Sequence, residues 1–196
     1  MNASGFVEAT RLGLEHNTWK SLDEWIGRES SFSYNSDNYE QSDDIVFDEL
    51  VFNEIISLLS NECFLNSEGS SHVLRILEYD WKTLSGHQKA TLLPAITTAF
   101  TNLSDSLSVF IVSELLGEYY CSESSFKALK SLRNVSEDMQ RALIPVGLYY
   151  IAKTSTDQKL ARLAHDELVK MNADKSEQVR AEVIMHLAKL KPNKKR

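Results

Sequence analysis

The sequence predicts an all-α fold built from antiparallel helical hairpins, and three observations support that prediction. Only seven glycines and three prolines occur among the 196 residues, whereas an all-β fold needs turn residues every few positions. Apolar residues recur at helical spacing along most of the chain. The polar segments between these periodic stretches are short, and short connections make successive helices antiparallel.

The first 28 residues predict two short helices, over residues 6–15 and 18–28. The apolar residues of the second helix follow the spacing of one buried face: Trp19, Leu22, Trp25 and Ile26. The periodicity then stops. Serine, asparagine and aspartate dominate residues 29–44, and these side chains compete with helix formation by bonding to their own backbone. We therefore expect an N-terminal helical segment over residues 1–28 and an acidic polar loop over residues 29–44.

Residues 45–190 predict a larger helical domain. Its first helix, about 45–64, follows a capping sequence at residues 42–44. That helix carries the apolar residues Ile45, Val46, Leu50, Ile55, Leu58 and Leu59. Capping residues also precede the other predicted helices, which cover residues 71–80, 86–101, 105–120, 124–133, 137–153, 157–171 and 175–190. Residues 191–196 form a basic tail.

Two of these helices share a proline-containing pattern. Residues 90–96 match residues 141–147 at the proline and at the two apolar positions before it, and the Arg-Ala pair at Arg141 recurs 39 residues later at Arg180. These features resemble HEAT-like α-helical repeat proteins over residues 86–190, and the resemblance implies hairpins stacked as a solenoid. The two prolines are 51 residues apart, which is not one regular repeat, so an irregular helical bundle is the alternative fold.

The sequence shows no complete catalytic or metal-binding motif. Cys63 and Cys121 are far apart and predict buried free thiols. The five histidines lack the spacing of paired metal ligands, and the glycines do not cluster as a phosphate-binding loop requires. His165-Asp166 resembles the dipeptide with which helical HD-type phosphohydrolases hold a metal, but the companion ligands of that class are missing. We therefore expect no enzyme activity, no metal and no cofactor.

Composition and charge indicate a cytoplasmic protein that binds neither membranes nor nucleic acid. The N-terminus lacks a secretory signal, and the apolar runs end well before the roughly 18 residues of a membrane span. Residues 122–196 hold 15 bases and nine acids. Acids are interspersed among these bases, and the isoelectric point of the chain is about 5.3, so the basic residues are interpreted as solvated helix faces.

The acidic front of the chain predicts a surface that binds a protein. Residues 1–80 hold 16 acids and four bases, and aromatic residues are interspersed with acids between Phe32 and Phe52. Tyrosine offers a large contact area, and carboxylates steer a basic partner into place. We expect the contact to be made by Tyr34, Asp37, Tyr39, Glu40, Asp43, Asp44 and Asp48.

The small size, acidic charge, scarcity of glycine and HEAT-like helices together resemble the immunity proteins with which bacteria neutralise their own toxins. The resemblance implies a non-catalytic protein that binds a cognate toxin, a nuclease-type effector with a basic surface, and blocks its active site. Two alternatives remain open. One is a scaffold or adaptor subunit that contacts its partners along residues 86–190, and the other is a helical hydrolase that uses His165 and Asp166.

Overall fold

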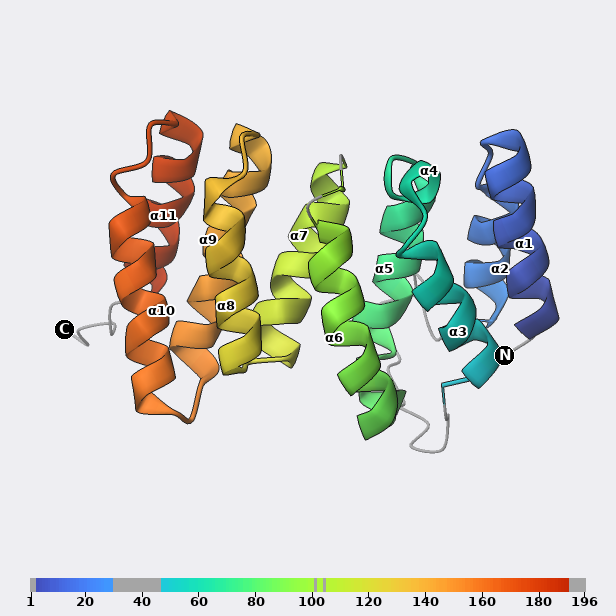
Figure 1. Cartoon of the computed structure of the whole chain (residues 1–196), viewed down its shortest axis with the longest axis horizontal. Coiled ribbons are helices and arrows are strands. Elements are labelled where there is room, and N and C mark those ends of the chain that lie inside the picture. The colour runs from blue at the N-terminus through green and yellow to red at the C-terminus, as the bar shows by residue number, and fades with distance from the viewer. Residues whose placement is uncertain (1–2, 30–46, 101, 104, 191–196) are drawn as a thin grey trace. The chain divides into compact units, whose positions relative to one another are not determined.

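A computed structural model describes residues 3–29, 47–100, 102–103 and 105–190. Within these residues the chain forms helices and no strands, which confirms the predicted all-α fold (Figure 1). The predicted loop at 29–44, except its first residue, and the predicted tail at 191–196 lie outside the described residues. The α-helices are α1 (Ala3–His16), α2 (Lys20–Glu29), α3 (Glu49–Leu58), α4 (Glu62–Leu65), α5 (Gly69–Tyr79), α6 (Gly86–Phe100), α7 (Ser106–Glu114), α8 (Glu123–Ser131), α9 (Asp138–Thr154), α10 (Gln158–Met171) and α11 (Glu177–Leu190).

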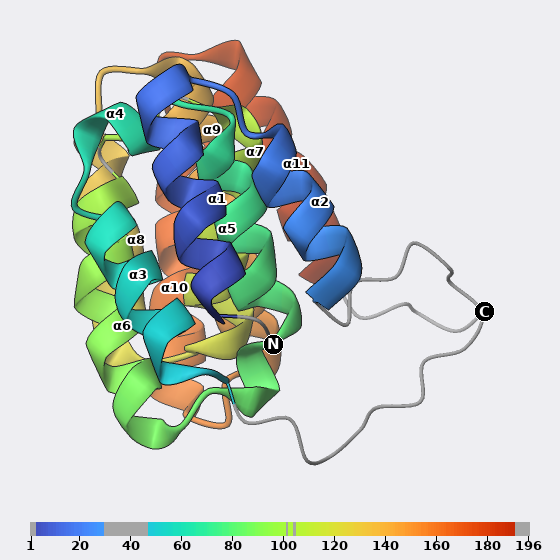
Figure 2. The ribbon, with the colours of Figure 1, turned by 90° about the vertical axis from the view of Figure 1, so that its right-hand side faces the viewer.

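Internal contacts divide the chain into two compact units, Met1–Ser108 and Val109–Arg196. The boundary falls inside α7 and inside the segment 45–190. In the first unit, α1 lies beside α2 and α3, α2 lies against α5, and α3 lies against α6 (Figures 1 and 2). In the second unit, α9 is the central helix, because α8, α10 and α11 all contact it.

Aromatic rings form much of the core of the first unit. The rings of Phe6 and Trp25 lie 4.8 Å apart, and those of Trp19 and Phe64 lie 5.5 Å apart in an edge-to-face arrangement, which is a favourable geometry for aromatic pairs. The third tryptophan of the chain, Trp81, is also buried in this unit.

The indole of Trp19 lies between two glycines. A Cβ atom added at Gly13 would lie 2.5 Å from this ring, and one added at Gly69 would meet the same ring from α5. Real Cβ atoms do not approach other atoms so closely, so any side chain at either position would displace the indole. The two glycines therefore let α1 and α5 share one tryptophan.

The predicted helix over 45–64 is wrong in its boundaries. Asp48 is extended (ψ 132°) and caps α3, so the helix begins at Glu49. Asn61 is also extended, and its side chain accepts a hydrogen bond from the N–H of Phe64, so a new short helix, α4, begins there. Two N-capping side chains, Asp48 and Asn61, thus start separate helices inside a stretch predicted to be one helix.

Two arginines of the second unit, Arg141 in α9 and Arg180 in α11, make the same contact with the connection that precedes their own helix. Arg180 Nη1 donates to the main-chain oxygens of Asp174 and Lys175, at 2.7 and 2.9 Å. Arg141 Nη1 donates in the same way to the main-chain oxygens six and five residues before it, at 2.9 and 2.8 Å. The Arg-Ala pattern that recurs in the sequence therefore marks a repeated contact, in which an arginine holds the connection that precedes its own helix.

Arg141 also links α9 to the connection that precedes α11. Its guanidinium donates to both carboxylate oxygens of Asp174, at 3.2 and 3.1 Å, and to Asp138, at 2.6 Å. The arginine is only 3% exposed. Burial by itself raises the pKa of Asp174, but hydrogen bonds from Arg141 and from the N–H of Ser176 outweigh burial and leave that pKa below its usual value.

A π-helical segment, Leu115–Tyr119, follows α7 and lies against α9. The two backbones approach each other closely at Gly117 and Gly147. A Cβ added at Gly117 would lie 2.6 Å from the Cα of Gly147, and one added at Gly147 would lie 2.6 Å from the main-chain oxygen of Ser113. The contact between the two segments therefore requires glycine on both sides.

Candidate functional site

Six of the seven residues predicted to contact a partner lie outside the described residues: Tyr34, Asp37, Tyr39, Glu40, Asp43 and Asp44. The seventh, Asp48, is described. Its side chain accepts hydrogen bonds from the N–H groups of Leu50, at 2.8 Å, and Val51, at 3.1 Å. Asp48 therefore caps α3, and its carboxylate stabilises this helix whether or not it also meets a partner.

The first turns of α3 present an unusually exposed leucine. Leu50 is 67% exposed, although it is one of the apolar residues of the helix predicted over 45–64. At helical spacing, Asn53 and Ser57 lie on the same outward face as Leu50, and both are exposed. Glu49 and Glu54 lie on the two flanks of that face. These five residues form a surface that we call the α3 face.

Both flanking carboxylates of the α3 face are held by neighbouring helices. Glu49 accepts a hydrogen bond of 3.0 Å from the side-chain amide of Gln88 in α6. Glu54 accepts one of 2.9 Å from the hydroxyl of Thr10 in α1. Neutral donors fix these carboxylates in position without cancelling their charge. The α3 face is therefore an exposed apolar side chain between two oriented negative charges.

The position of Gln88 is itself fixed by the start of α6. The main-chain N–H of Ser85 donates to the Gln88 side-chain oxygen at 2.8 Å, and the N–H of Gln88 donates to the Ser85 hydroxyl at 3.1 Å. This reciprocal pair is a capping box, and it confirms the predicted start of the helix at Ser85-Gly86. The cap leaves the amide group of Gln88 free to reach Glu49 on α3.

The aromatic residues at the end of the predicted contact stretch belong to the core. Phe47 and Phe52 are buried, and their rings meet edge to face with centroids 6.4 Å apart. Residues this deeply buried have no exposed ring to offer a partner. In the described part of the stretch, the apolar contact area therefore comes from Leu50.

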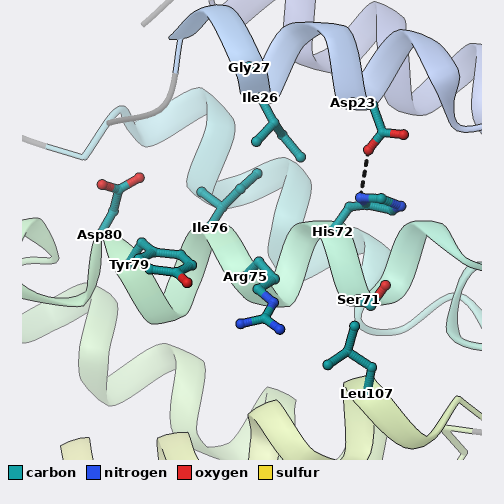
Figure 3. A pocket seen from close by; sticks show the side chains of 10 residues that line it. All are labelled: Asp23, Ile26, Gly27, Ser71, His72, Arg75, Ile76, Tyr79, Asp80 and Leu107. Atoms are coloured by element: carbon teal, nitrogen blue, oxygen red, sulfur yellow. Dashed lines mark ion pairs between the residues drawn. The ribbon is translucent and has the colours of Figure 1, made fainter. Parts of the chain in front are cut away.

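A second feature of the first unit is a pocket between α2 and α5 with a volume of about 650 Å³. Figure 3 shows Arg75 near the middle of its lining side chains, with Ile26 on α2 and Leu107 on α7 facing it from other elements. At one end His72 Nδ1 lies 2.6 Å from a carboxylate oxygen of Asp23, which ties α5 to α2. The volume falls in the range of small-molecule sites.

Residues singled out for metal or thiol chemistry do not converge in the described structure. His165 and Asp166 are exposed side chains on α10, and the nearest atoms of their polar groups are 3.7 Å apart. Among the described residues, no group of three or more His, Cys, Asp or Glu side chains is placed to hold a metal ion. Both cysteines are free, but Cys63 is exposed and Cys121 is half-buried, so their predicted burial is wrong.

The two compact units carry opposite net charges. Residues 1–108 hold 17 acids and six bases, a net charge of −11, and residues 109–196 hold 11 acids and 15 bases, a net charge of +4. Part of the positive charge in the second unit is used internally, because Arg133 pairs with the buried Glu167 at 2.8 Å and Arg141 pairs with Asp174. The first unit has only six bases for its 17 acids, so less of its negative charge is offset by positive charge.

Comparison with known protein families, with curated proteins and with solved structures finds no match to this chain. None of the helices in the described ranges is both long enough and apolar enough to cross a membrane.

Proposed function

We propose that the chain is a non-catalytic, cytosolic immunity protein that binds a cognate toxin domain with a basic surface and blocks it. The observation that supports this proposal best is the α3 face, where Leu50 is exposed between the held carboxylates of Glu49 and Glu54. An exposed apolar side chain gains free energy when a partner covers it. Carboxylates beside it favour a basic partner and accelerate its association.

The α3 face also directly follows the residues predicted from the sequence to bind the partner. Asp43 and Asp44 precede it in the chain, and Asp48 caps its helix. The unit that bears this surface has a net charge of −11. A basic nuclease-type toxin binds phosphates with lysine and arginine, and carboxylates can occupy the same side chains, which would block its substrate.

A HEAT-like stacking of hairpins is part of the proposal for the second unit. It is supported by the equivalent contacts of Arg141 and Arg180, which lie 39 residues apart and hold the connections before α9 and α11. Repeats that stack in this way present extended surfaces to partners. The alternative function, a scaffold or adaptor subunit, is favoured by one observation: α11 exposes Ile184, at 59%, beside Met185.

The test is affinity capture of the tagged full-length chain in its native cell, at low and at high salt, followed by mass spectrometry. The expected result is one basic protein at stoichiometric yield, whose retention falls at high salt because screening weakens the attraction between charges. Several neutral proteins that survive high salt would support the scaffold function instead.

Two matched substitutions locate the contact. Leu50→Gln removes the exposed apolar side chain of the α3 face, and Ile184→Gln makes the same change on α11. Both positions are exposed, so neither substitution should alter folding. We expect Leu50→Gln to weaken capture of the basic protein and Ile184→Gln to leave it unchanged. The opposite pattern would contradict the proposed site and assign the contact to the second unit.

A further inference from the structure

We propose that the pocket between α2 and α5 is a binding site for a small monocarboxylate with an apolar body, with Arg75 holding the carboxylate. This site is separate from the α3 face, and the proposal does not depend on the immunity function. It rests on three properties of the pocket: the open edge of one guanidinium, an apolar wall, and neighbouring carboxylates that are either paired or buried.

The guanidinium of Arg75 has one edge available for a ligand. Its Nη1 donates to Glu78 at 3.3 Å, and in the described part of the chain Nε and Nη2 donate to no other side chain or carbonyl. The Nε–Nη2 edge presents two parallel N–H groups, which match the two oxygens of a carboxylate. The side chain is 35% exposed, so a ligand can reach this edge while the pocket shields part of the interaction from water.

Apolar side chains line the pocket from three elements. Ile26 comes from α2, Ile76 from α5 and Leu107 from α7 (Figure 3). A ligand that placed its carboxylate on Arg75 would cover Leu107, which is 40% exposed, and the half-buried Ile26 with its apolar body and remove them from water, whereas Ile76 is already buried. The volume of about 650 Å³ accommodates an aryl or branched alkyl group in addition to the carboxylate.

The other charged residues of the pocket indicate which charge a bound ligand would carry. Asp23 and Asp80 line the pocket, but His72 already pairs with Asp23, and Asp80 is only 5% exposed, with its Oδ2 fully buried. A cationic ligand would have to displace His72 from Asp23 or reach the buried carboxylate of Asp80, whereas Arg75 can bind an anion directly. The same two carboxylates repel negative charge, so they favour a monoanion over a phosphate dianion.

Titration of the ¹⁵N-labelled full-length chain, followed by amide NMR, tests the ligand class with three compounds of nearly equal size: phenylbutyrate, phenylbutanol and phenylbutylamine. The expected result is saturable shifts confined to amides of α2, α5 and the start of α7, with tightest binding for the carboxylate, weaker binding for the alcohol and weakest for the amine. Tightest binding of the amine, or no saturable shifts with any of the three, would overturn the proposal.

Three substitutions test the site itself. Arg75→Gln keeps a polar side chain but loses the charged fork, and should weaken phenylbutyrate binding by about tenfold or more while changing phenylbutanol binding little. Gly27 lines the pocket, and a Cβ there meets nothing within 4 Å, so Gly27→Leu should fold and should reduce binding of all three compounds. Gly86→Leu is the matched control, because Gly86 is equally open but lies outside the pocket.

An effect of Arg75→Gln that is equal for the carboxylate and the alcohol would show that the arginine does not hold the ligand charge. An effect of Gly86→Leu as large as that of Gly27→Leu would show that the compounds bind elsewhere. Either result contradicts the proposal. The amide spectra of the variants report at the same time that each one remains folded.

Discussion

At the residue scale, two glycines allow two helical segments of the second unit to come into close contact. Gly117 in the π-helical segment and Gly147 in α9 bring their backbones together, and the atoms that a new Cβ would meet at Gly117 are all main-chain atoms. Main-chain atoms in helices cannot rotate away as a flexible side chain can. A side chain at Gly117 could therefore be accommodated only if a whole helical segment moved.

Gly117→Ala should lower the free energy of unfolding by about 3 kcal/mol, because the added methyl group forces these segments apart. The control is Gly27→Ala, where a Cβ meets nothing and the better helix propensity of alanine should raise stability by about 0.5–1 kcal/mol. Urea denaturation followed by circular dichroism compares the two. Equal stabilities of Gly117→Ala and the parent chain would show that the contact is looser than described.

Competing electrostatic effects set the pKa of one buried histidine. His186 is 5% exposed and its ring lies 5.1 Å from that of Tyr149. Glu182 lies 3.7 Å from its Nε2 and favours the protonated ring. Burial opposes protonation more strongly, with help from the positive charge of Lys189, and lowers the pKa of His186 to about 4.

This lowered pKa makes stability depend on pH. Between about pH 6.5, the usual histidine pKa, and pH 4, the unfolded chain binds a proton that the folded chain does not, so unfolding becomes easier as pH falls. The contribution is fully present above pH 6.5 and reaches a loss of up to about 3 kcal/mol near pH 4. His186→Phe, which keeps an aromatic ring, should have a shallower pH profile of unfolding free energy across this window; identical profiles would contradict the assignment.

At the scale of helices and their connections, Arg141 and Arg180 allow a matched comparison. Both hold two main-chain oxygens of the preceding connection, but Arg141 alone of the two also binds the carboxylate of Asp174. Arg141→Ala should therefore cost about 3–5 kcal/mol, because it leaves Asp174 largely buried without its charged partner. Arg180→Ala should cost about 1–2 kcal/mol, the contribution of its hydrogen bonds.

Thermal and urea unfolding of these two variants measures the difference. Arg141→Ala with Asp174→Asn is the control, since removal of both charges should restore part of the lost stability. Two single variants with equal losses would show that the ion pair with Asp174 adds nothing to the shared main-chain contacts.

The sequence predicted the helices well where capping residues and apolar periodicity agree. The starts of α6, α8 and α10 follow Ser85, Ser122 and Asp157 as expected, and each of these side chains accepts a main-chain N–H. Prediction failed at α3, where one helix was expected over residues 45–64. The stripe of Val51, Ile55 and Leu58 is complete without Leu50, and Asp48-Glu49 has the composition of a helix start, so those signals together could have placed Leu50 outside.

The candidate sites were less predictable than the helices, for a physical reason. Caps and periodicity act within one segment, whereas the α2–α5 pocket depends on Asp23 and His72 meeting across 48 intervening residues. The carboxylates of the α3 face likewise depend on Thr10 and Gln88 from other helices. Single-sequence patterns contain no direct signal for such long-range pairs.

At the scale of the whole molecule, charge is divided between the two units rather than mixed evenly. The net charges of −11 and +4 mean that an approaching basic protein is attracted chiefly by the first unit. Such attraction acts mainly on the association rate and is screened by salt over about 8 Å at physiological ionic strength.

Equal changes in net charge should therefore have unequal effects on binding of the proposed basic partner. Replacing Glu24, Glu62 and Glu68 by glutamine removes three charges from the first unit, and replacing Glu118, Glu123 and Glu137 removes three from the second. The first set should slow association at low salt by roughly tenfold, and the second should change it little. Stopped-flow association with the captured partner measures both; equal effects would mean that only the total charge matters.

The placement of the three tryptophans gives the two units different optical signals. Trp19, Trp25 and Trp81 are all buried in the first unit, and the second unit contains none. Tryptophan emission therefore follows the unfolding of residues 1–108 alone, whereas circular dichroism at helical wavelengths follows both units together. Coincident transitions in the two signals mean one cooperative structure, and separated transitions give each unit its own stability without cutting the chain.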